Sequence, residues 1–353
     1  MYSATMFQAV QKNSGRQPRV QRVILLGVLA YEAIGAILGG ILLIVRPDGR
    51  LMNMPVDIMN GVFRDFLLPG YILLGLGILN AIAFLAVLRR NYADWILASL
   101  ANGGLLIWFV VEIAVLQQTH WLHFMWGFPI VVGSLMMLSL FPVQPATVRK
   151  ALIICGILSS LIYVVANVVT VILYKGYDPV SQTVSELSAI NAPTRPLWDL
   201  TLVIYDLFVL AFAWGIWQSP VKKLRIVAGL ITIYIVIGFF WPPMHQRQVL
   251  AAGGGSLTDT LHIVFTMVTV ALMIMIIVFG GVAFGKSFLF YSIATLVILI
   301  FFGILTGRDG PEISANLPTP LVGIWERINI GAYMLWIVIL AFTLLQREKK
   351  LVR

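Results

Sequence analysis

Residues 261–284 read LHIVFTMVTVALMIMIIVFGGVAF, a run without a single Asp, Glu, Lys or Arg. The hydrocarbon core of a bilayer needs about 20 such residues in helical form, because a helix rises about 1.5 Å per residue. Comparable runs recur along the chain, at residues 23–45, 66–88, 95–116, 121–141, 151–174, 198–217, 224–241, 287–306 and 321–345. They are continuously apolar, without the alternating pattern of a membrane β-barrel. The sequence therefore predicts an all-α, polytopic membrane protein with about ten transmembrane helices.

The composition supports a membrane environment and narrows the function classes. Hydrophobic residues make up 60% of the 353 residues, charged residues make up 11%, and the mean hydropathy is +0.94. A soluble protein carries about 25% charged residues, so this chain lacks the polar surface that water requires. Cys155 is the only cysteine, which excludes an intramolecular disulfide and a four-cysteine zinc site. The sequence also contains no motif for binding a nucleotide, haem or an iron–sulfur cluster.

The basic residues predict the orientation of the helices. With the N-terminus in the cytoplasm, the cytoplasmic segments contain sixteen of the 24 Lys and Arg residues and two of the fifteen acidic residues, a net charge of +14. The remaining eight basic and thirteen acidic residues give a net charge of −5. Because positive charge is retained inside during insertion, we predict that both termini are cytoplasmic, in a bacterial cytoplasmic membrane.

The high pI comes from the same basic residues at helix ends and does not indicate binding to nucleic acid. The pI is about 9.8, but the basic residues form short clusters at helix ends, where membrane topology requires them. Such clusters also contact anionic lipids. We therefore expect membrane lipids as partners, and partner membrane proteins in one of the functional hypotheses below.

A break in the apolar pattern divides the chain. The segment Phe141 to Lys150, FPVQPATVRK, carries two prolines and a basic pair between the fourth and fifth predicted helices. We place a domain boundary here, with a four-helix module at residues 1–147 and a six-helix module at residues 148–353. The halves share no motif that would indicate the inverted repeat of many transporters.

Polar residues gather in the loops predicted at the outer face, and all four histidines lie there: His120, His123, His245 and His262. Asp259 and His262 are three residues apart at the start of a predicted helix. That spacing lets a carboxylate orient an imidazole or lets both groups bind a metal. The candidate catalytic residues are His245, His262, Asp259, Glu186 and Ser185, and the candidate ligands of a divalent metal are His245, His262 and Asp259. The alternative is that these histidines are interfacial and that Asp259 caps its helix.

Five charged residues lie four or more residues from either end of a predicted span: Glu32, Glu112, Asp206, Glu326 and Arg327. An ionised group in lipid costs several kcal/mol, so each should face protein or a hydrated cavity. Glu32 lies about 13 Å into its helix, whereas the other four are in the outer half. We expect a cavity open to the outside or to the outer leaflet, and a carboxylate on another helix as the partner of Arg327. Structural pairing is the alternative explanation for these residues.

The six-helix module resembles the bacterial membrane family known as domain of unknown function 998, over residues of about 148–350. The resemblance is carried by YDPVSQTVSELSA at 177–189, the Trp241–Pro243 exit, His262, and GIWERINIGAYMLW at 323–336. The four-helix module resembles small uncharacterised bacterial proteins that have a PDG loop, here Pro47–Gly49, and an IPG-like helix start, here Leu68–Gly70. More distantly, the Ser-Glu-Leu loop and the helix-starting histidine are similar to eukaryotic membrane proteins linked to lipid remodelling. Neither bacterial family implies an activity.

Three functions remain open from the sequence. The first is a metal-assisted or acid–base hydrolase or transferase acting on lipid at the outer leaflet. The second is a proton-coupled transporter or flippase that uses Glu32, Glu112 or Asp206 as a titrating group. The third is a non-catalytic protein that handles lipid or an envelope component, or binds a partner membrane protein.

Overall fold

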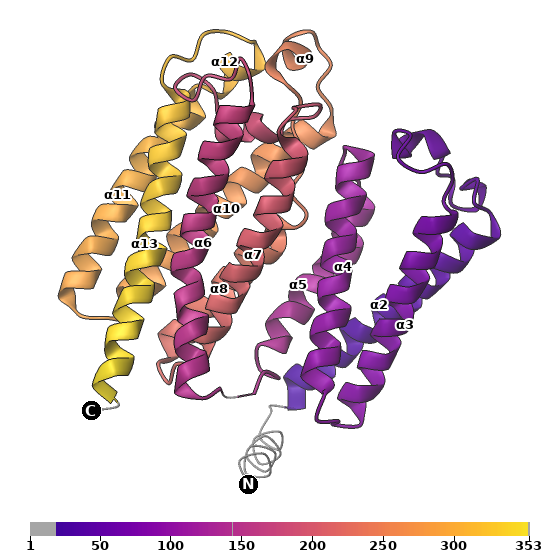
Figure 1. Cartoon of the computed structure of the whole chain (residues 1–353), viewed down its shortest axis with the longest axis horizontal. Helices are drawn as coiled ribbons and strands as arrows, with labels where there is room; N and C mark the ends of the chain where they lie inside the picture. The colour runs from indigo at the N-terminus through magenta and orange to yellow at the C-terminus, as the bar shows by residue number, and fades with distance from the viewer. Residues whose placement is uncertain (1–18, 143, 352–353) are drawn as a thin grey trace. The chain divides into compact units, whose positions relative to one another are not determined.

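The computed structural model describes residues 19–142 and 144–351, and within these ranges it contains helices and no strand (Figure 1). Ten of the helices in the described chain have 17 residues or more: α2 (Arg19–Val45), α3 (Leu67–Leu88), α4 (Asp94–Leu116), α5 (Trp121–Met137), α6 (Ala146–Leu173), α7 (Arg195–Trp217), α8 (Lys222–Gly238), α10 (Leu257–Gly281), α11 (Lys286–Arg308) and α13 (Val322–Leu351). They coincide with the ten predicted runs. The prediction of an all-α, polytopic membrane protein is confirmed.

Eight of these helices are long and apolar enough to cross a bilayer by length and composition. The other two, α5 and α8, have 17 residues each, the lower limit for a transmembrane helix. Short helical turns lie in the connections: η1 (Arg50–Met52), η2 (Val56–Met59), η3 (Val184–Ser188), α9 (Arg247–Ala251) and α12 (Gly310–Ser314). Lys12, Arg16 and Arg353, which contribute to the predicted orientation, lie outside the described residues.

The chain divides into two compact units, residues 1–143 and residues 144–353, here called unit 1 and unit 2. The first helix of unit 2 begins at Ala146, so the boundary expected between residues 147 and 148 lies just inside that helix. Unit 1 contains α2 to α5, and unit 2 contains α6 to α13.

Small residues let the helices of unit 1 approach one another closely. A Cβ at Gly40 or Gly77 would lie 2.7 Å from a backbone nitrogen of the facing helix, Leu74 in the first case and Ile37 in the second. This close approach of α2 to α3 is typical of helix pairs in membranes, where packing rather than the hydrophobic effect holds helices together. Between α2 and α5, Trp126 of α5 fills the space beside Gly35 of α2, and Val28 of α2 lies against Gly133 of α5.

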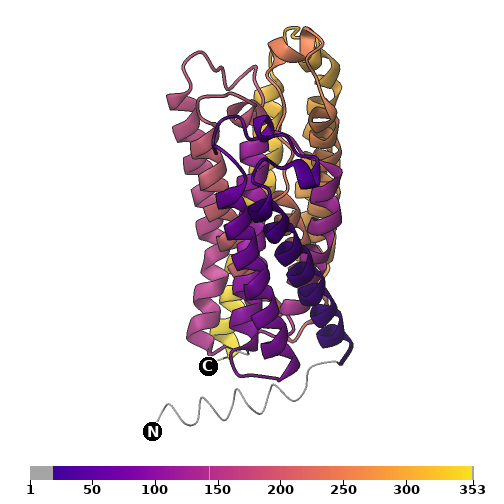
Figure 2. The same ribbon diagram turned by 90° about the vertical axis from the view of Figure 1, so that its right-hand side faces the viewer.

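Unit 2 is packed around fully buried side chains from several helices, among them Phe212, Ile216, Ile231 and Trp336. Its long connections, residues 174–194, 239–256 and 309–321, lie at one end, where α9 and α12 are seen in both views (Figure 1, Figure 2). The connections at the other end, residues 218–221 and 282–285, are short. We call the first end the long-loop end of unit 2.

The connection between α6 and α7 is held against the helices by its own apolar side chains. Val184 and Leu187 of η3 are buried in a cluster with Tyr177 and Trp198. Burial of such a side chain contributes about 1.5–3 kcal/mol. After η3, the backbone N–H of Ile190 donates to the carbonyl of Met244, 2.7 Å away, and so joins this connection to the one between α8 and α10.

Candidate functional site

The site is built on η3, the single helical turn in the loop between α6 and α7. Thr183 and Glu186 form a capping box, in which Glu186 Oε2 accepts from the Thr183 backbone N–H at 2.7 Å and from its hydroxyl at 2.9 Å. The Thr-x-x-Glu spacing is the sequence signature of this arrangement. The capping box fixes the two residues between its ends, one of which is Ser185.

Ser185 faces His262, which lies in the second turn of α10. The distance from Ser185 Oγ to His262 Nε2 is 3.1 Å, and His262 Nδ1 is 2.7 Å from the carbonyl oxygen of Pro242. A carbonyl oxygen only accepts hydrogen bonds, so Nδ1 carries the proton and Nε2 offers its lone pair to the serine hydroxyl. This tautomer follows from the hydrogen-bonding partners. The serine hydroxyl is therefore bonded to one nitrogen of an imidazole whose other nitrogen is held by the Pro242 carbonyl.

The two members of this pair differ in accessibility. His262 is only 7% exposed, with the ring of Trp241 packed against it edge to face at 5.3 Å between centroids. Ser185 is partly exposed. A substrate can therefore reach the hydroxyl while protein covers the imidazole.

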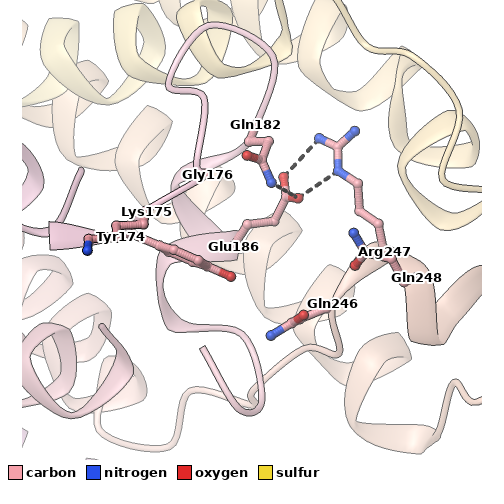
Figure 3. Close-up of a pocket in the computed structure, with 8 residues that line it drawn as sticks. All are labelled: Tyr174, Lys175, Gly176, Gln182, Glu186, Gln246, Arg247 and Gln248. Carbon is pink, nitrogen blue, oxygen red and sulfur yellow. Dashed lines mark hydrogen bonds and ion pairs between the residues drawn. The ribbon is translucent and has the colours of Figure 1, made fainter. Parts of the chain in front are cut away.

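Glu186, the next residue along η3, forms a buried ion pair with Arg247 of α9. Arg247 Nε is 2.6 Å from Oε1 of Glu186, and Arg247 Nη2 is 2.8 Å from Oε2 (Figure 3). The side chains of Glu186 and Arg247 are 5% and 9% exposed. Arg247 also donates to the hydroxyl of Thr319 and to the carbonyl of Ser181. Both carboxylate oxygens are bonded, and through Arg247 the ion pair joins three connections of the long-loop end.

A polar pocket of about 110 Å³ lies beside this ion pair (Figure 3). It is lined by Tyr174, Lys175, Gly176, Gln182, Glu186, Gln246, Arg247 and Gln248. Ser185 and His262 do not line this pocket. The turn η3 therefore contributes Glu186 to the pocket and presents the neighbouring Ser185 elsewhere, to His262.

Glu326 and Arg327, near the start of α13, hold η3 from the helix side. Glu326 Oε2 accepts from the backbone N–H of Val184 at 2.5 Å. Arg327 donates to the hydroxyl of Tyr177 at 2.7 Å, to the side chain of Asn167, and to the carbonyls of Pro179, Gln182 and Gly323. In the described chain no carboxylate accepts from Arg327, so the expected pairing with a carboxylate on another helix is wrong.

Tyr177 connects Arg327 to the backbone of η3. Its hydroxyl accepts from Arg327 Nη2 and donates to the carbonyl of Thr183, 2.6 Å away. Burial raises the pKa of Tyr177 far above its usual value, although the bond and charge of Arg327 act in the opposite direction. The hydroxyl therefore stays protonated and continues to donate.

Asp259 orients His245, and His262 has other partners. Asp259 Oδ1 accepts from the backbone N–H of His245 at 2.7 Å, and Oδ2 is 2.9 Å from His245 Nδ1. Oδ2 also accepts from the N–H of Ser256, which caps α10. Among the described residues, no three His, Cys, Asp or Glu side chains are close enough to hold a metal ion. Of the three candidate metal ligands, the structure thus pairs His245 with Asp259 and bonds His262 to Ser185 and Pro242.

The other charged residues inside the spans have different surroundings. Glu32 on α2 and Glu112 on α4 belong to unit 1, where Glu112 Oε2 is 3.9 Å from Nε2 of His123. Asp206 is buried in α7. The structure adds two buried ion pairs that the sequence analysis missed, Glu186–Arg247 and Arg22–Asp94. Their partners are 61 and 72 residues apart, and only the Thr-x-x-Glu motif gave a local signal for either of them.

Comparison with known proteins places unit 2 in a family. The family model described as "Protein of unknown function (DUF998)" matches residues 157–343, from within α6 to within α13. No curated protein and no solved structure matches the chain. The matched region contains Ser185, Glu186, Arg247 and His262 and excludes all of unit 1. Because the match covers more than half of the sequence, this multi-pass membrane protein belongs to the DUF998 family.

Proposed function

We propose that this protein is a membrane-embedded hydrolase or acyltransferase that cleaves an acyl ester of a membrane lipid, with Ser185 as nucleophile and His262 as base. The observation that carries the proposal is the 3.1 Å contact between Ser185 Oγ and His262 Nε2, with Nδ1 bonded to the carbonyl of Pro242. A nucleophile bonded to a base that a third group orients is the arrangement expected for covalent catalysis.

The reaction follows from these contacts. His262 Nε2 takes the hydroxyl proton as Ser185 Oγ attacks the ester carbonyl carbon, and the imidazolium then protonates the departing alcohol. Water, deprotonated by the same imidazole, releases the acid from the acyl-serine; a second alcohol in place of water gives acyl transfer. The Pro242 carbonyl holds the ring and stabilises the imidazolium, but less strongly than the carboxylate of a full triad does. We therefore expect slower turnover than in an enzyme with a complete triad.

The position of the pair supports lipid as the substrate. His262 lies in the second turn of a membrane-spanning helix, and Ser185 lies in the loop against it. Lipid headgroups reach this depth. The nearby pocket presents Lys175 and three glutamine side chains, which suit a polar headgroup.

We further propose that the long-loop end of unit 2 faces outward from a bacterial cytoplasmic membrane, as the charge distribution predicts. Cysteine labelling tests this orientation, because Cys155 is the only native cysteine and Cys155→Ala gives a cysteine-free background. Ala252→Cys, after α9, and Ser287→Cys, in the first turn of α11, then place single exposed thiols at opposite ends of unit 2. An impermeant maleimide added to intact cells should label the first and spare the second. The reverse pattern would place the Ser185 site on the inner side.

A fluorophosphonate probe tests the nucleophile directly. In this reaction Ser185 Oγ bonds to phosphorus, fluoride leaves, and His262 takes the proton. Purified protein in lipid nanodiscs should be labelled at Ser185, Ser185→Ala should lose the label, and His262→Gln should slow labelling by about 10²–10⁴-fold. Ser188→Ala is the matched control, because Ser188 lies on the same turn and its hydroxyl bonds only to the Ser185 carbonyl. Equal labelling of wild type and Ser185→Ala, or no labelling of either, would remove the proposal.

A further inference from the structure

Unit 1 lies outside the matched family region, yet it buries an unusual number of polar side chains. Among the described residues of unit 1, eight are less than 9% exposed: Arg22, Glu32, Asn80, Asp94, Asn102, Thr119, His123 and Ser134. Polar groups inside a membrane-spanning bundle are costly to bury and mark structural pairing or a pathway for ions or protons. The positions of these residues along the bundle distinguish the two explanations.

Contacts between the helices give the depth of each polar group. On α5, Trp126 lies beside Gly35 and Gly133 beside Val28, so the part of α5 midway between them is level with Glu32. Ser134 bonds to Asn102 at 2.8 Å, and Asn102 also lies beside Gly133. The Asn102–Ser134 pair is therefore about 8 Å from Glu32, toward the beginning of α2.

The same contacts place the other groups. His123 is three residues before Trp126 and so lies about 9 Å from Glu32, toward the end of α2. Asn80 is one turn beyond Gly77, which faces Ile37, and is thus level with Glu32. The buried pair of Arg22 and Asp94, 2.8 Å apart, lies at the opposite end from His123. Buried polar groups therefore follow one another along the length of unit 1.

Glu32 stands at the centre of this series. It is the middle residue of α2, it is 3% exposed, and its Oε1 atom is buried with no hydrogen-bond partner. The paired groups at the beginning of α2 need no further partner, whereas Glu32 does. A buried carboxylate without a partner is unfavourable, and a proton on the oxygen removes its charge.

The groups toward the end of α2 are suited to carry that proton. The backbone N–H of His120 is 2.8 Å from Nδ1 of His123, and the His120 carbonyl oxygen is 3.1 Å from the same atom, so both contacts of Nδ1 are with the backbone at the start of α5. Nε2 is buried without a partner and points toward Glu112 Oε2, 3.9 Å away. That gap is too long for a hydrogen bond. The separation of about 9 Å along the bundle is one that a hydrogen-bonded chain of two or three water molecules would span.

Few other ionisable groups can influence Glu32. Among the described residues, α3 contributes only the exposed Tyr71 and α5 contributes only His123. The ionisable residues elsewhere in the helices and turns of this unit are Arg19, Arg22 and Tyr31 on α2, Asp94 and Glu112 on α4, the exposed Arg50 of η1, and Asp57 of η2. Arg22 already bonds to Asp94 and to the carbonyl of Val87.

We propose that Glu32 is a proton-binding site inside unit 1 and that it exchanges its proton with water past His123 and Glu112. The proton moves between the carboxyl oxygen and a water chain, and no other reactant is needed. This site is independent of the Ser185 chemistry, so either proposal can fail alone.

Infrared difference spectroscopy of the full-length protein in lipid vesicles tests proton binding. The difference between acidic and alkaline buffer should contain the carbonyl stretch of a protonated carboxylic acid in an apolar environment. Glu32→Gln should lose that band, Glu32→Asp should retain it at a shifted frequency, and Asp57→Asn in the η2 turn should leave it unchanged. The amide band in the same spectra reports whether each variant is folded. A band of unchanged intensity in folded Glu32→Gln, or no band in the wild type, would overturn the proposal.

The route is tested by the rate at which this band shifts after transfer into heavy water. His123→Phe should slow the shift by at least tenfold, because it removes the group between Glu32 and the water. Asn102→Leu is the matched control on the other side of Glu32 and should leave the rate unchanged. Slowing by Asn102→Leu and not by His123→Phe would refute the route past His123.

Discussion

Glu186 and Glu32 are buried to nearly the same extent, 4% and 3% exposed, but their surroundings differ. In unit 2 both oxygens of Glu186 bond to Arg247, and the ion pair joins the loops that carry Ser185. In unit 1 one oxygen of Glu32 has no partner. A buried carboxylate with a full set of partners fixes a structure, whereas one without them is free to gain and lose a proton. Burial alone therefore does not distinguish a structural glutamate from a functional one.

The largest expected effect comes from breaking the ion pair between Glu186 and Arg247. Arg247→Leu leaves the Glu186 carboxylate buried without its cation, which costs about 3–5 kcal/mol in the free energy of unfolding. Thermal unfolding in nanodiscs should show a fall in Tm, together with loss of fluorophosphonate labelling. The control is Arg308→Leu, since the Arg308 side chain is 70% exposed where it approaches Asp309. An unchanged Tm in Arg247→Leu would mean that the ion pair does not hold the loops.

A second prediction concerns the support of Ser185 from α13. Glu326→Leu removes the acceptor of the Val184 N–H and leaves that group unsatisfied, at a cost of about 1–3 kcal/mol. We expect the rate of labelling at Ser185 to fall about tenfold or more, because η3 loses its anchor on α13. Glu326→Gln keeps an oxygen that can accept the same bond and should restore most of the rate. Equal rates for Glu326→Leu and wild type would show that Glu326 does not position Ser185.

The helices were easier to predict from the sequence than the contacts that hold the loops. Every transmembrane helix was predictable, because a long apolar run in lipid satisfies its backbone groups only as a helix. Helix ends were less certain: α5 ends at Met137, four residues before the predicted end, and α8 ends at Gly238, before Trp241 and its two prolines.

In the candidate site, the sequence pointed to the residues but not to their partners. Ser185, Glu186 and His262 were singled out from loop position and spacing, and the structure brings Ser185 to His262. Asp259 does not bond to His262, because i, i+3 spacing brings two side chains to one helix face without making them bond. Its carboxylate instead satisfies backbone N–H groups of the preceding loop. Pairings such as Glu186 with Arg247 depend on how separate loops meet, which no local pattern encodes.

The third prediction concerns Glu32, which has no ion-pair partner among the described residues. In contrast to Arg247→Leu, its replacement should not lower the free energy of unfolding. Glu32→Gln replaces a buried carboxyl by a neutral group of the same shape, so the free energy of unfolding should change by no more than about 0.5 kcal/mol or should increase. Tm measurements at neutral pH, beside those of Arg247→Leu, provide the check. A loss of several kcal/mol would mean that the Glu32 carboxylate has a partner and is structural.

The smallest effect concerns Asp178, an exposed carboxylate at the long-loop end of unit 2. Its Oδ2 accepts from the Ser181 hydroxyl, and its Oδ1 accepts from the Val180 N–H. These bonds, the one from Ser181 foremost, lower the pKa of Asp178 below its usual value. A lowered pKa means that its contribution to stability is present above the unfolded-state pKa of about 3.9 and is lost as pH falls through the folded-state pKa. Asp178→Asn should therefore have a slightly lower Tm than wild type at pH 7, and the gap should close in acid. Asp57→Asn in the loop of unit 1 is the control for general effects of acid, and a gap that widens on acidification would contradict this account.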